Sequence, residues 1–395
     1  MNKPGFLTVA AKLVLNVHDL NNEGSIGQTT DIRTIRMVDE NGKEIGEVPA
    51  VSGRMLKHWH LAYMLREELE SGPPKLCAQC KVWEPERKPQ DETAGINACV
   101  ICDAHGFLCT DKPGFTVAIA VSNDTITLKK EARDDEPEET FNVLFCEHAK
   151  ENMDKNCPTC AVRQLDGKRA RVSGELSTDE EGKKTIKVTF VQEIGRGKDK
   201  IKVGSDPKGL SLRRSSCINF SWLLPVLTAD STAKQVIHSR VASSGGEGED
   251  TSQMIFYKSY ASSIYGFVCS IDLNRIGKPL VGNTTLADEE IKRRRQMAVR
   301  ALLPMVTGAF GASQSHALPH TKCLGVIAAL SDNITPLPNL VSPIYSNGFG
   351  ESVIMLKAFG NTNVKYWGYG EPPVDVANKK PDPQNLFKTI LDELK

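Results

Sequence analysis

Residues 52–70 read SGRMLKHWHLAYMLREELE. Ser52 is a favoured N-cap residue, and the sequence that follows predicts an amphipathic helix from Gly53 to Glu70. Two segments before this helix, Phe6–Val17 and Thr30–Val38, are predicted to be extended, because each mixes apolar and β-branched residues over one strand length. The predicted apolar stripe of the helix consists of Met55, Trp59, Leu61, Met64 and Leu65.

Strands and helices continue to alternate along the rest of the chain. We expect a hairpin at Phe115–Lys129, a pair of strands at Arg171–Gln192 and a long extended run at Met254–Leu273. A helix with a basic face is expected at Glu289–Val306, and buried strands are expected at Cys323–Leu330 and Ser352–Ala358. A tail rich in proline and charge begins at Pro372 and ends in a short amphipathic helix. These elements, interrupted by long insertions, predict an α+β fold.

Six of the 11 cysteines stand in Cys-x-x-Cys pairs. Two pairs, Cys77/Cys80 and Cys99/Cys102, have the spacing of four thiolates that surround one zinc ion. Disulfides are the alternative, but such close neighbours form strained bridges and nothing in the chain indicates an oxidising compartment. We therefore predict a structural zinc site, which leaves no open position for catalysis.

A second zinc site is predicted from Cys146, His148, Cys157 and Cys160, a Cys-x-His followed by the third Cys-x-x-Cys pair. The alternative is that Cys146 and His148 are ordinary residues at the end of a strand. His105 and Cys109 compete as ligands at either site.

The charges of the chain balance, with 49 basic and 49 acidic residues, so net charge argues neither for nor against nucleic acid. Their distribution is more informative, because Gly195–Arg214 is basic and rich in glycine and serine. Such a segment suits a phosphate backbone, although a solvated loop has the same composition. Its candidate phosphate contacts are Arg196, Lys198 and Lys200.

The sequence carries no pattern typical of a secreted protein, a membrane protein or a common class of enzyme. The apolar run from Phe6 is cut by Lys12 and lacks a cleavage site, and no stretch has the length of a membrane span. We therefore expect a cytoplasmic chain with reduced thiols and no membrane partner. No P-loop, Rossmann glycine pattern, His-Glu-x-x-His or Gly-x-Ser-x-Gly is present, so we expect no enzyme.

Four blocks of sequence resemble, in the same order, the CRISPR-associated DevR family, which contains the repeated backbone subunit of type I Cascade complexes in the RAMP superfamily. The first block is the start of the predicted helix together with the residues before it, and Leu20–Gly27 resembles the first loop of that family. The blocks are Pro49–His60, His238–Val241, Gln253–Gly266 and Ala301–Ser313.

The resemblance implies a ferredoxin-like, RRM-like palm with helical finger, thumb and zinc-binding insertions. It implies that residues 1–71 form the first part of the palm with the early helix and that residues 72–112 form a zinc-binding insertion. Further insertions, with the second zinc site and the basic segment, would occupy residues 113–235. The second part of the palm, with a thumb-like segment and the glycine loop, would occupy residues 236–371, and residues 372–395 would be a tail. Its partners would be a CRISPR RNA, target DNA through that guide, further copies of the chain, and other Cascade subunits.

A subunit of this kind must hold the sugar–phosphate backbone without reading bases, because every guide differs. The resemblance, with the basic segment above, implies RNA contacts from basic, amide and glycine residues, namely Arg54, Lys57, His58, Arg240, Gln253, Gly308, Gly311, Ser313 and Gln314. Packing around Trp59 is the alternative for His58, and an ion pair is the alternative for Arg240. Met254–Phe256 form either a core strand or wedge residues that separate bases.

Two other functions stay open. One is an RNA-guided endoribonuclease subunit of a type III-like effector, which would use Asp19 or Glu23 with a divalent metal ion. The sequence carries no aspartate between Asn21 and Ser25, which agrees with a subunit that does not cleave. The other is a zinc-stabilised protein-interaction module that binds no RNA.

Overall fold

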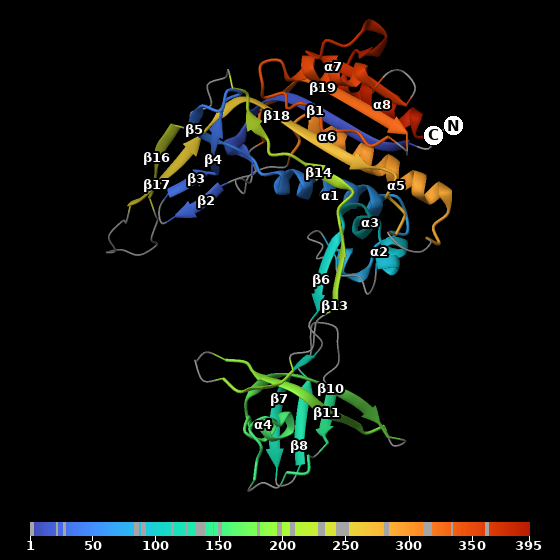
Figure 1. Ribbon diagram of the computed structural model, residues 1–395. Helices are drawn as coiled ribbons and strands as arrows, with labels where there is room; N and C mark the ends of the chain where they lie inside the picture. The colour runs from blue at the N-terminus through green and yellow to red at the C-terminus, as the bar shows by residue number, and fades with distance from the viewer. Residues whose placement is uncertain are drawn as a thin grey trace. The chain divides into compact units, whose positions relative to one another are not determined.

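The computed structural model describes residues 4–20, 23–26, 29–82, 87, 92–111, 114–122, 125–130, 139–144, 146–148, 152–179, 182–195, 200–205, 210–227, 234–241, 253–279, 284–310, 318–332, 335–359 and 363–395. The chain divides into two compact units. Unit 1 comprises Met1–Leu108 and Arg213–Lys395, and unit 2 comprises Cys109–Leu212. Helices and sheets occur together, so the predicted α+β class is confirmed (Figure 1).

The main sheet of unit 1 is built around its first strand, β1 (Pro4–Asn16), which pairs antiparallel with a strand on each side. Ala10 lies opposite Val268 on one neighbour and Ile327 on the other. Leu7 to Ala11 are all buried, as expected of a central strand covered on both faces. The spatial order is β14 (Ile218–Phe220), β18 (Ser262–Asp272), β1, β19 (Thr321–Asp332), β20 (Val364–Gly370) and β21 (Lys379–Lys380), and β15 (Leu224–Pro225) pairs with β18.

Helices cover both faces of this sheet. α7 (Gly348–Ala358) shares a core cluster with Ala10 and Val268 on one face. Because side chains alternate along a strand, Val9 and Ala11 point to the other face, where α6 packs against β1. Three further helices pack against α6 (Leu302–Val306), namely α1 (Gly53–Glu70), α5 (Asp288–Arg300) and α8 (Pro383–Glu393). The elements β1, α1, β14, β18, α5 and β19 occur in the chain in the order β-α-β-β-α-β, with other elements inserted between them.

Smaller elements complete unit 1. A four-stranded sheet has the order β16 (Lys234–Val241), β17 (Gln253–Tyr260), β3 (Thr29–Ile32) and β2 (Glu23–Ile26), and β4 (Thr34–Val38) forms a hairpin with β5 (Glu44–Pro49). The short helices are α2 (Glu92–Ala98), α3 (Val100–His105) and the 3-10 turns η1 (Val17–Asp19), η2 (Ala78–Cys80) and η3 (Val376–Asn378). β6 (Phe107–Asp111) and β13 (Leu210–Arg214) pair where the chain passes between the units.

The described residues of unit 2 form a six-stranded sheet and one helix, α4 (Pro158–Arg163). Its strands are β7 (Phe115–Ser122), β8 (Thr125–Lys130), β9 (Glu139–Val143), β10 (Arg169–Thr178), β11 (Lys184–Glu193) and β12 (Lys202–Gly204). The predicted hairpin of β7 with β8 and the predicted pair of β10 with β11 are both confirmed. Residues from the strands and from α4 form one core.

The bounds of the early helix agree with their prediction, but its buried face differs in part, because Leu56 and His60 are buried whereas the predicted Met55 and Trp59 are only half-buried. α1 begins and ends where the sequence predicts, and the Ser52 hydroxyl accepts a hydrogen bond from the Met55 amide at 3.3 Å. Gly53 is required at its start, since a Cβ there would lie 2.5 Å from the Phe220 carbonyl oxygen of β14. No helix among the described residues is both long and apolar enough to cross a bilayer.

Residues 352–358 form the end of helix α7, so the predicted strand at Ser352–Ala358 is wrong. The run is apolar and partly β-branched, which resembles a buried strand when its neighbours are ignored. Its burial has helical spacing, because Val353 and Leu356 are buried whereas Ile354 is 68% exposed. The extended run at Met254–Leu273 is likewise two strands, β17 and β18, separated at Ala261.

The predicted helix at Glu289–Val306 breaks at Ala301 into α5 and α6, and its basic face is not a solvated surface. Arg294 is fully buried. Its guanidinium binds the buried Asp103 carboxylate at 3.0 Å and Glu290 at 2.8 Å. Arg214 of β13 binds the same Asp103 carboxylate at 2.8 Å, and the Gly277 amide donates to it at 2.8 Å. One carboxylate on α3 thus joins α5, β13 and the turn after β18.

Asp103→Ala tests this arrangement. The substitution leaves two buried guanidinium groups without their shared carboxylate, so we expect the free energy of unfolding of unit 1 to fall by about 3–5 kcal/mol. All four tryptophans lie in the sequence of unit 1, so urea unfolding followed by tryptophan fluorescence reports on that unit. Glu70→Ala is the control, because Glu70 pairs with Arg66 on the exposed surface and its loss should cost about 1 kcal/mol or less. Equal effects of the two substitutions would contradict the role of Asp103.

Candidate metal centres and nucleic-acid interface

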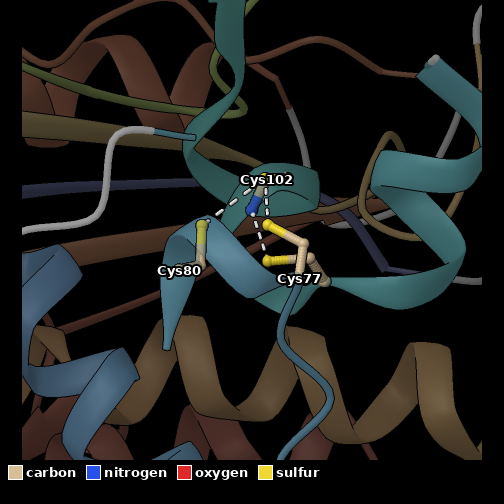
Figure 2. A group of neighbouring side chains, drawn as sticks. Cys77, Cys80 and Cys102 are labelled. Carbon is tan, nitrogen blue, oxygen red and sulfur yellow. Dashed lines mark hydrogen bonds between the residues drawn. The ribbon is translucent and has the colours of Figure 1, made fainter. Parts of the chain in front are cut away.

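Four cysteines of unit 1 converge as the sequence predicts. Figure 2 shows Cys77 and Cys80 on one turn and Cys102 on α3, with their sulfur atoms directed at one another. The Cys102 sulfur lies 3.8 Å from that of Cys77 and 3.7 Å from that of Cys80. Cys99 completes the group, and the four ligand atoms lie within 4.8 Å of one another. Thiolates about 2.3 Å from a tetrahedral ion lie roughly 3.8 Å apart, so the geometry fits a metal ion held by four sulfur atoms.

The local backbone explains this convergence. Cys77 precedes the 3-10 turn η2, and the Cys80 amide donates to the Cys77 carbonyl at 2.9 Å. Cys99 occupies the N-cap of α3, where its sulfur accepts from the Cys102 amide at 3.4 Å. Hydrogen bonds from the thiols of Cys102 and Cys99 lower the pKa of Cys80 to about 5. Hydrogen bonds with neighbouring cysteines also lower the pKa of Cys99, whereas such bonds, together with burial, raise the pKa values of Cys77 and Cys102. Two of the four sulfur atoms, those of Cys80 and Cys99, therefore favour the thiolate form that binds metal.

The ion-pair network of unit 1 holds this cysteine group in place. Asp103 follows Cys102 directly and binds Arg214 and Arg294. On the other side of the group, Lys75 pairs with Glu290 at 3.0 Å, and its backbone amide donates to Glu68 at 2.7 Å. Both segments that carry the cysteines are thus fixed to α1 or α5. Sequence reasoning missed these residues, because their partners lie far away along the chain.

A second group of four ligands lies in unit 2, again as predicted. Cys146 and His148 follow β9, Cys157 caps α4 and Cys160 lies within that helix, and their ligand atoms lie within 4.8 Å of one another. The sulfur atoms of Cys146 and Cys160 are 3.5 Å apart. His148 is exposed, which distinguishes this group from the more deeply buried first one. A metal ion here would hold α4 against the end of β9.

Of the two other ligand candidates, His105 joins neither group. His105 lies against His60, with 3.1 Å between Nε2 of His105 and Nδ1 of His60. Burial lowers the pKa of His60 to about 4 and lowers that of His105 as well, so both rings are neutral at pH 7. The side chain of Cys109 lies outside the described residues. Ten cysteines are described, and none of these forms a disulfide, so the disulfide alternative is not supported there.

The predicted RNA contacts on α1 take different positions. Arg54 is exposed near the start of the helix, and the His58 ring stands edge-on to Trp59 with 5.5 Å between ring centroids. Lys57 is half-buried, and burial with the nearby Arg87 lowers its pKa to about 8. Its ammonium group therefore titrates near physiological pH, unlike an ordinary lysine.

The structure brings α1 to the start of the predicted glycine loop. The Tyr63 hydroxyl donates to the Ala309 carbonyl at 2.7 Å. Gly308 has φ of +87°, and a Cβ there would meet Thr321 at 2.5 Å, so this position requires glycine. Sequence reasoning missed Tyr63, although it stands one helical turn after Trp59. Gly311, Ser313 and Gln314 lie outside the described residues.

The remaining predicted contacts are only partly described. In the hairpin of β16 and β17, Arg240 pairs with Met254 and Gln253 with Val241. Both candidates therefore stand at the same end of the hairpin, but the side chains here, and those of Met254–Phe256, lie outside the described part. Lys200 is exposed in unit 2. Arg196, Lys198 and the side chains of Asp19 and Glu23 also fall outside the described residues.

Comparison with known proteins gives consistent relatives. A 162-residue stretch is 33% identical to the CRISPR-associated protein Cas7/Cst2/DevR of Thermoproteus tenax, covering 38% of this chain and 48% of the relative. The protein of the same name in Methanocaldococcus jannaschii is 29% identical over 198 residues, 46% of this chain and 60% of the relative. The CRISPR-associated aCascade subunit Cas7/Csa2 2 of Saccharolobus solfataricus is 26% identical over 155 residues, 37% of this chain and 46% of the relative. The chain thus matches about half the length of these relatives.

Solved structures with similar chains include a CRISPR RNA-guided surveillance complex, at 11% identity and a TM-score of 0.43, and a pre-nicking CRISPR RNA-guided surveillance complex, at 13% and 0.45. Each alignment covers 99% of this chain and all of the other. The model of the family described as CRISPR-associated negative auto-regulator DevR/Csa2 matches residues 9–118 and 204–352. The match includes the first cysteine group and omits most of unit 2. The chain belongs to the CRISPR-associated DevR/Csa2 family.

Proposed function

We propose that this chain is a non-catalytic backbone subunit that binds CRISPR RNA in a type I Cascade surveillance complex. The observation that carries the proposal is the family match, which includes most of the main sheet of unit 1 and the helices α1 and α5. One relative of the chain is itself named an aCascade subunit. The endoribonuclease alternative is not favoured, because the relatives of this chain include a protein named as an aCascade subunit.

The main sheet of unit 1 would be the ferredoxin-like palm of this subunit. Its chain order β-α-β-β-α-β and its spatial order β14-β18-β1-β19 support that assignment. The first cysteine group would be a zinc-binding insertion held against the palm, and the second would be a zinc site within unit 2. Four sulfur ligands, or three with one imidazole, suit structural zinc.

Guide RNA would lie along α1 and the glycine loop that begins at Gly308. Arg54, Lys57 and His58 would contact phosphates, since a guide of any sequence presents the same backbone. Arg240, Gln253, Gly311, Ser313 and Gln314 would extend this surface, and the segment of Arg196, Lys198 and Lys200 would add phosphate contacts. Copies of the chain would stack head to tail along the guide, beside other Cascade subunits, and target DNA would pair with the guide. Thiol-rich metal groups suit the reducing cytoplasm.

Zinc content gives a direct test of both metal groups. We expect about two zinc ions per chain in freshly purified, reduced protein, by the count of ligand groups. Cys77→Ser with Cys99→Ser should remove about one ion, and Cys157→Ser with Cys160→Ser should remove the other. Elemental analysis by mass spectrometry measures both losses. Cys323→Ser is the control, because Cys323 belongs to neither group and its loss should leave the zinc content unchanged. Full zinc content in either double variant would contradict the assignment of that group.

The lowered pKa of Lys57 predicts a pH dependence of RNA binding. Its ammonium group loses charge as pH rises through about 8, so affinity for RNA should fall between pH 7 and pH 9. Lys57→Arg keeps its charge over this range and should bind with much less dependence on pH. The measurement is fluorescence anisotropy with a labelled single-stranded RNA. A pH profile that is identical in the wild type and Lys57→Arg would remove Lys57 from the RNA contact.

Salt dependence tests the same surface independently of pH. Arg54→Ala and Lys57→Ala should each reduce the slope of log affinity against log salt by about 0.7, the value for one phosphate contact on a single strand. Arg66→Ala is the matched control on the same helix, because Arg66 is exposed and pairs with Glu70 at 2.9 Å. If all three variants keep the wild-type slope, RNA does not lie along the start of α1.

A further inference from the structure

The strands of unit 2 close into a ring. β7 pairs with β8 and β8 with β9, after which β9 pairs with β11. β11 pairs with β10, and β10 returns to β7. The pairing of β9 with β11 is parallel and the other four are antiparallel. Five strands therefore form a closed barrel in the order β7-β8-β9-β11-β10, and α4 lies in the chain between β9 and β10.

This connectivity is that of the OB fold, a five-stranded Greek-key barrel that binds oligonucleotides or oligosaccharides. The interior supports the assignment, because Val117, Leu128, Phe141 and Val172 from the strands share one core with Val162 of α4. The family match ends at residue 118 and resumes at residue 204, so most of the barrel is additional to the family pattern. A fold does not by itself define a ligand, so the ligand must be argued from the barrel surface.

One face of the barrel presents a row of cations. Arg171 of β10 lies opposite Gln192 of β11, and Gln192 lies opposite Lys202 of β12, so the three side chains share a face. The Arg171 guanidinium and the Lys202 ammonium group both lie over the buried Phe190 ring, at 4.9 and 5.9 Å from its centroid. Arg169 stands two residues before Arg171 and is exposed. We call Arg169, Arg171 and Lys202 the cationic face.

The surroundings of the cationic face suit a single strand of nucleic acid. Small residues oppose its arginines on β7, with Ala118 opposite Arg169 and Thr116 opposite Arg171, so a ligand can approach closely. Ile194, which is 44% exposed, donates its amide to the Arg169 carbonyl at 2.9 Å. Cations beside an exposed apolar side chain match a strand that presents both phosphates and unstacked bases. The nearby Glu193 carboxylate is engaged by Lys168 at 2.9 Å, which limits its repulsion of phosphate.

We propose that unit 2 is an OB-type barrel that binds a single strand of nucleic acid across its cationic face. The inference extends the proposed function by a second nucleic-acid site, and its test is independent of the contacts on α1. The strand is either part of the guide RNA or a separate single strand, because both present the same phosphates. A partner protein would require neither the salt dependence nor the site size tested below.

The test compares two triple variants of the full chain. Arg169→Gln, Arg171→Gln and Lys202→Gln together remove the charge of the cationic face. Lys129→Gln, Lys130→Gln and Lys187→Gln remove the same charge from β8 and β11 and serve as the matched control. Hydrogen exchange of the β7 and β8 amides verifies that each barrel remains folded. The probes are labelled oligouridine and oligothymidine of about 12 nucleotides, within the site size of OB folds.

Each probe is measured by anisotropy over a range of salt, alone and with the protein first saturated with unlabelled guide-length RNA. The cationic-face variant should bind at least about tenfold more weakly at physiological salt, with a slope lower by about 2, whereas the control keeps wild-type values. If the cationic-face variant binds the probe more weakly only when no RNA was added first, the natural ligand of this face is the guide RNA. If its weaker binding persists after saturation with guide-length RNA, the ligand is a separate strand. Wild-type affinity and slope in the folded cationic-face variant overturn the proposal. Failure of Arg54→Ala and Lys57→Ala to affect binding would instead contradict the contacts on α1.

Discussion

The carboxylate of Asp103 is the point on which the packing of unit 1 depends. Two buried guanidinium groups bind it, one from Arg214 and one from Arg294, and the Gly277 amide donates to it. Charges buried this deeply are stable only when each has an opposite partner and its remaining hydrogen bonds are satisfied. Arg294 meets that requirement by also binding Glu290 and the Ile96 carbonyl. The network therefore fixes α3 and α5 in one arrangement, because any displacement separates several charges at once.

The first cysteine group and this network stabilise each other. Cys102 and Asp103 are adjacent on α3, so the residue that would bind metal and the residue that binds two arginines share one helical turn. A structural metal ion adds binding free energy to folding, since its ligands converge only in the folded chain. The ion pairs place α3, and a metal ion would fix the Cys77–Cys80 turn against it. This makes the cysteine-bearing segment a packed part of unit 1, which agrees with the family match running through it.

The sequence was sufficient where the signal is local. The Ser52 cap, the extent of α1 and both ligand groups depend on spacings of a few residues, and all were predicted correctly. It was insufficient where distant segments decide the outcome. Arg294 reads as one residue of a basic helix face until Asp103 is known to lie beside it, 191 residues away. Residues 352–358 read as a strand because only the packed structure distinguishes the exposed Ile354 from the buried Val353. The barrel was missed for the same reason, since its closure depends on the pairing of β9 with β11.

The position of the barrel in the chain explains how such an insertion can be accommodated. The chain leaves unit 1 along β6 and returns along β13, and these two strands pair with each other. An insertion whose two ends are adjacent does not require the host to change its core, and its length adds little closure entropy. β13 ends at Arg214, which binds Asp103, so the return point is fixed by the central ion pairs of unit 1. Unit 2 has its own core and its own group of metal ligands, so its surface can change without loss of stability in unit 1. The surface of the inserted unit can therefore differ without any change in the ion pairs that hold unit 1 together.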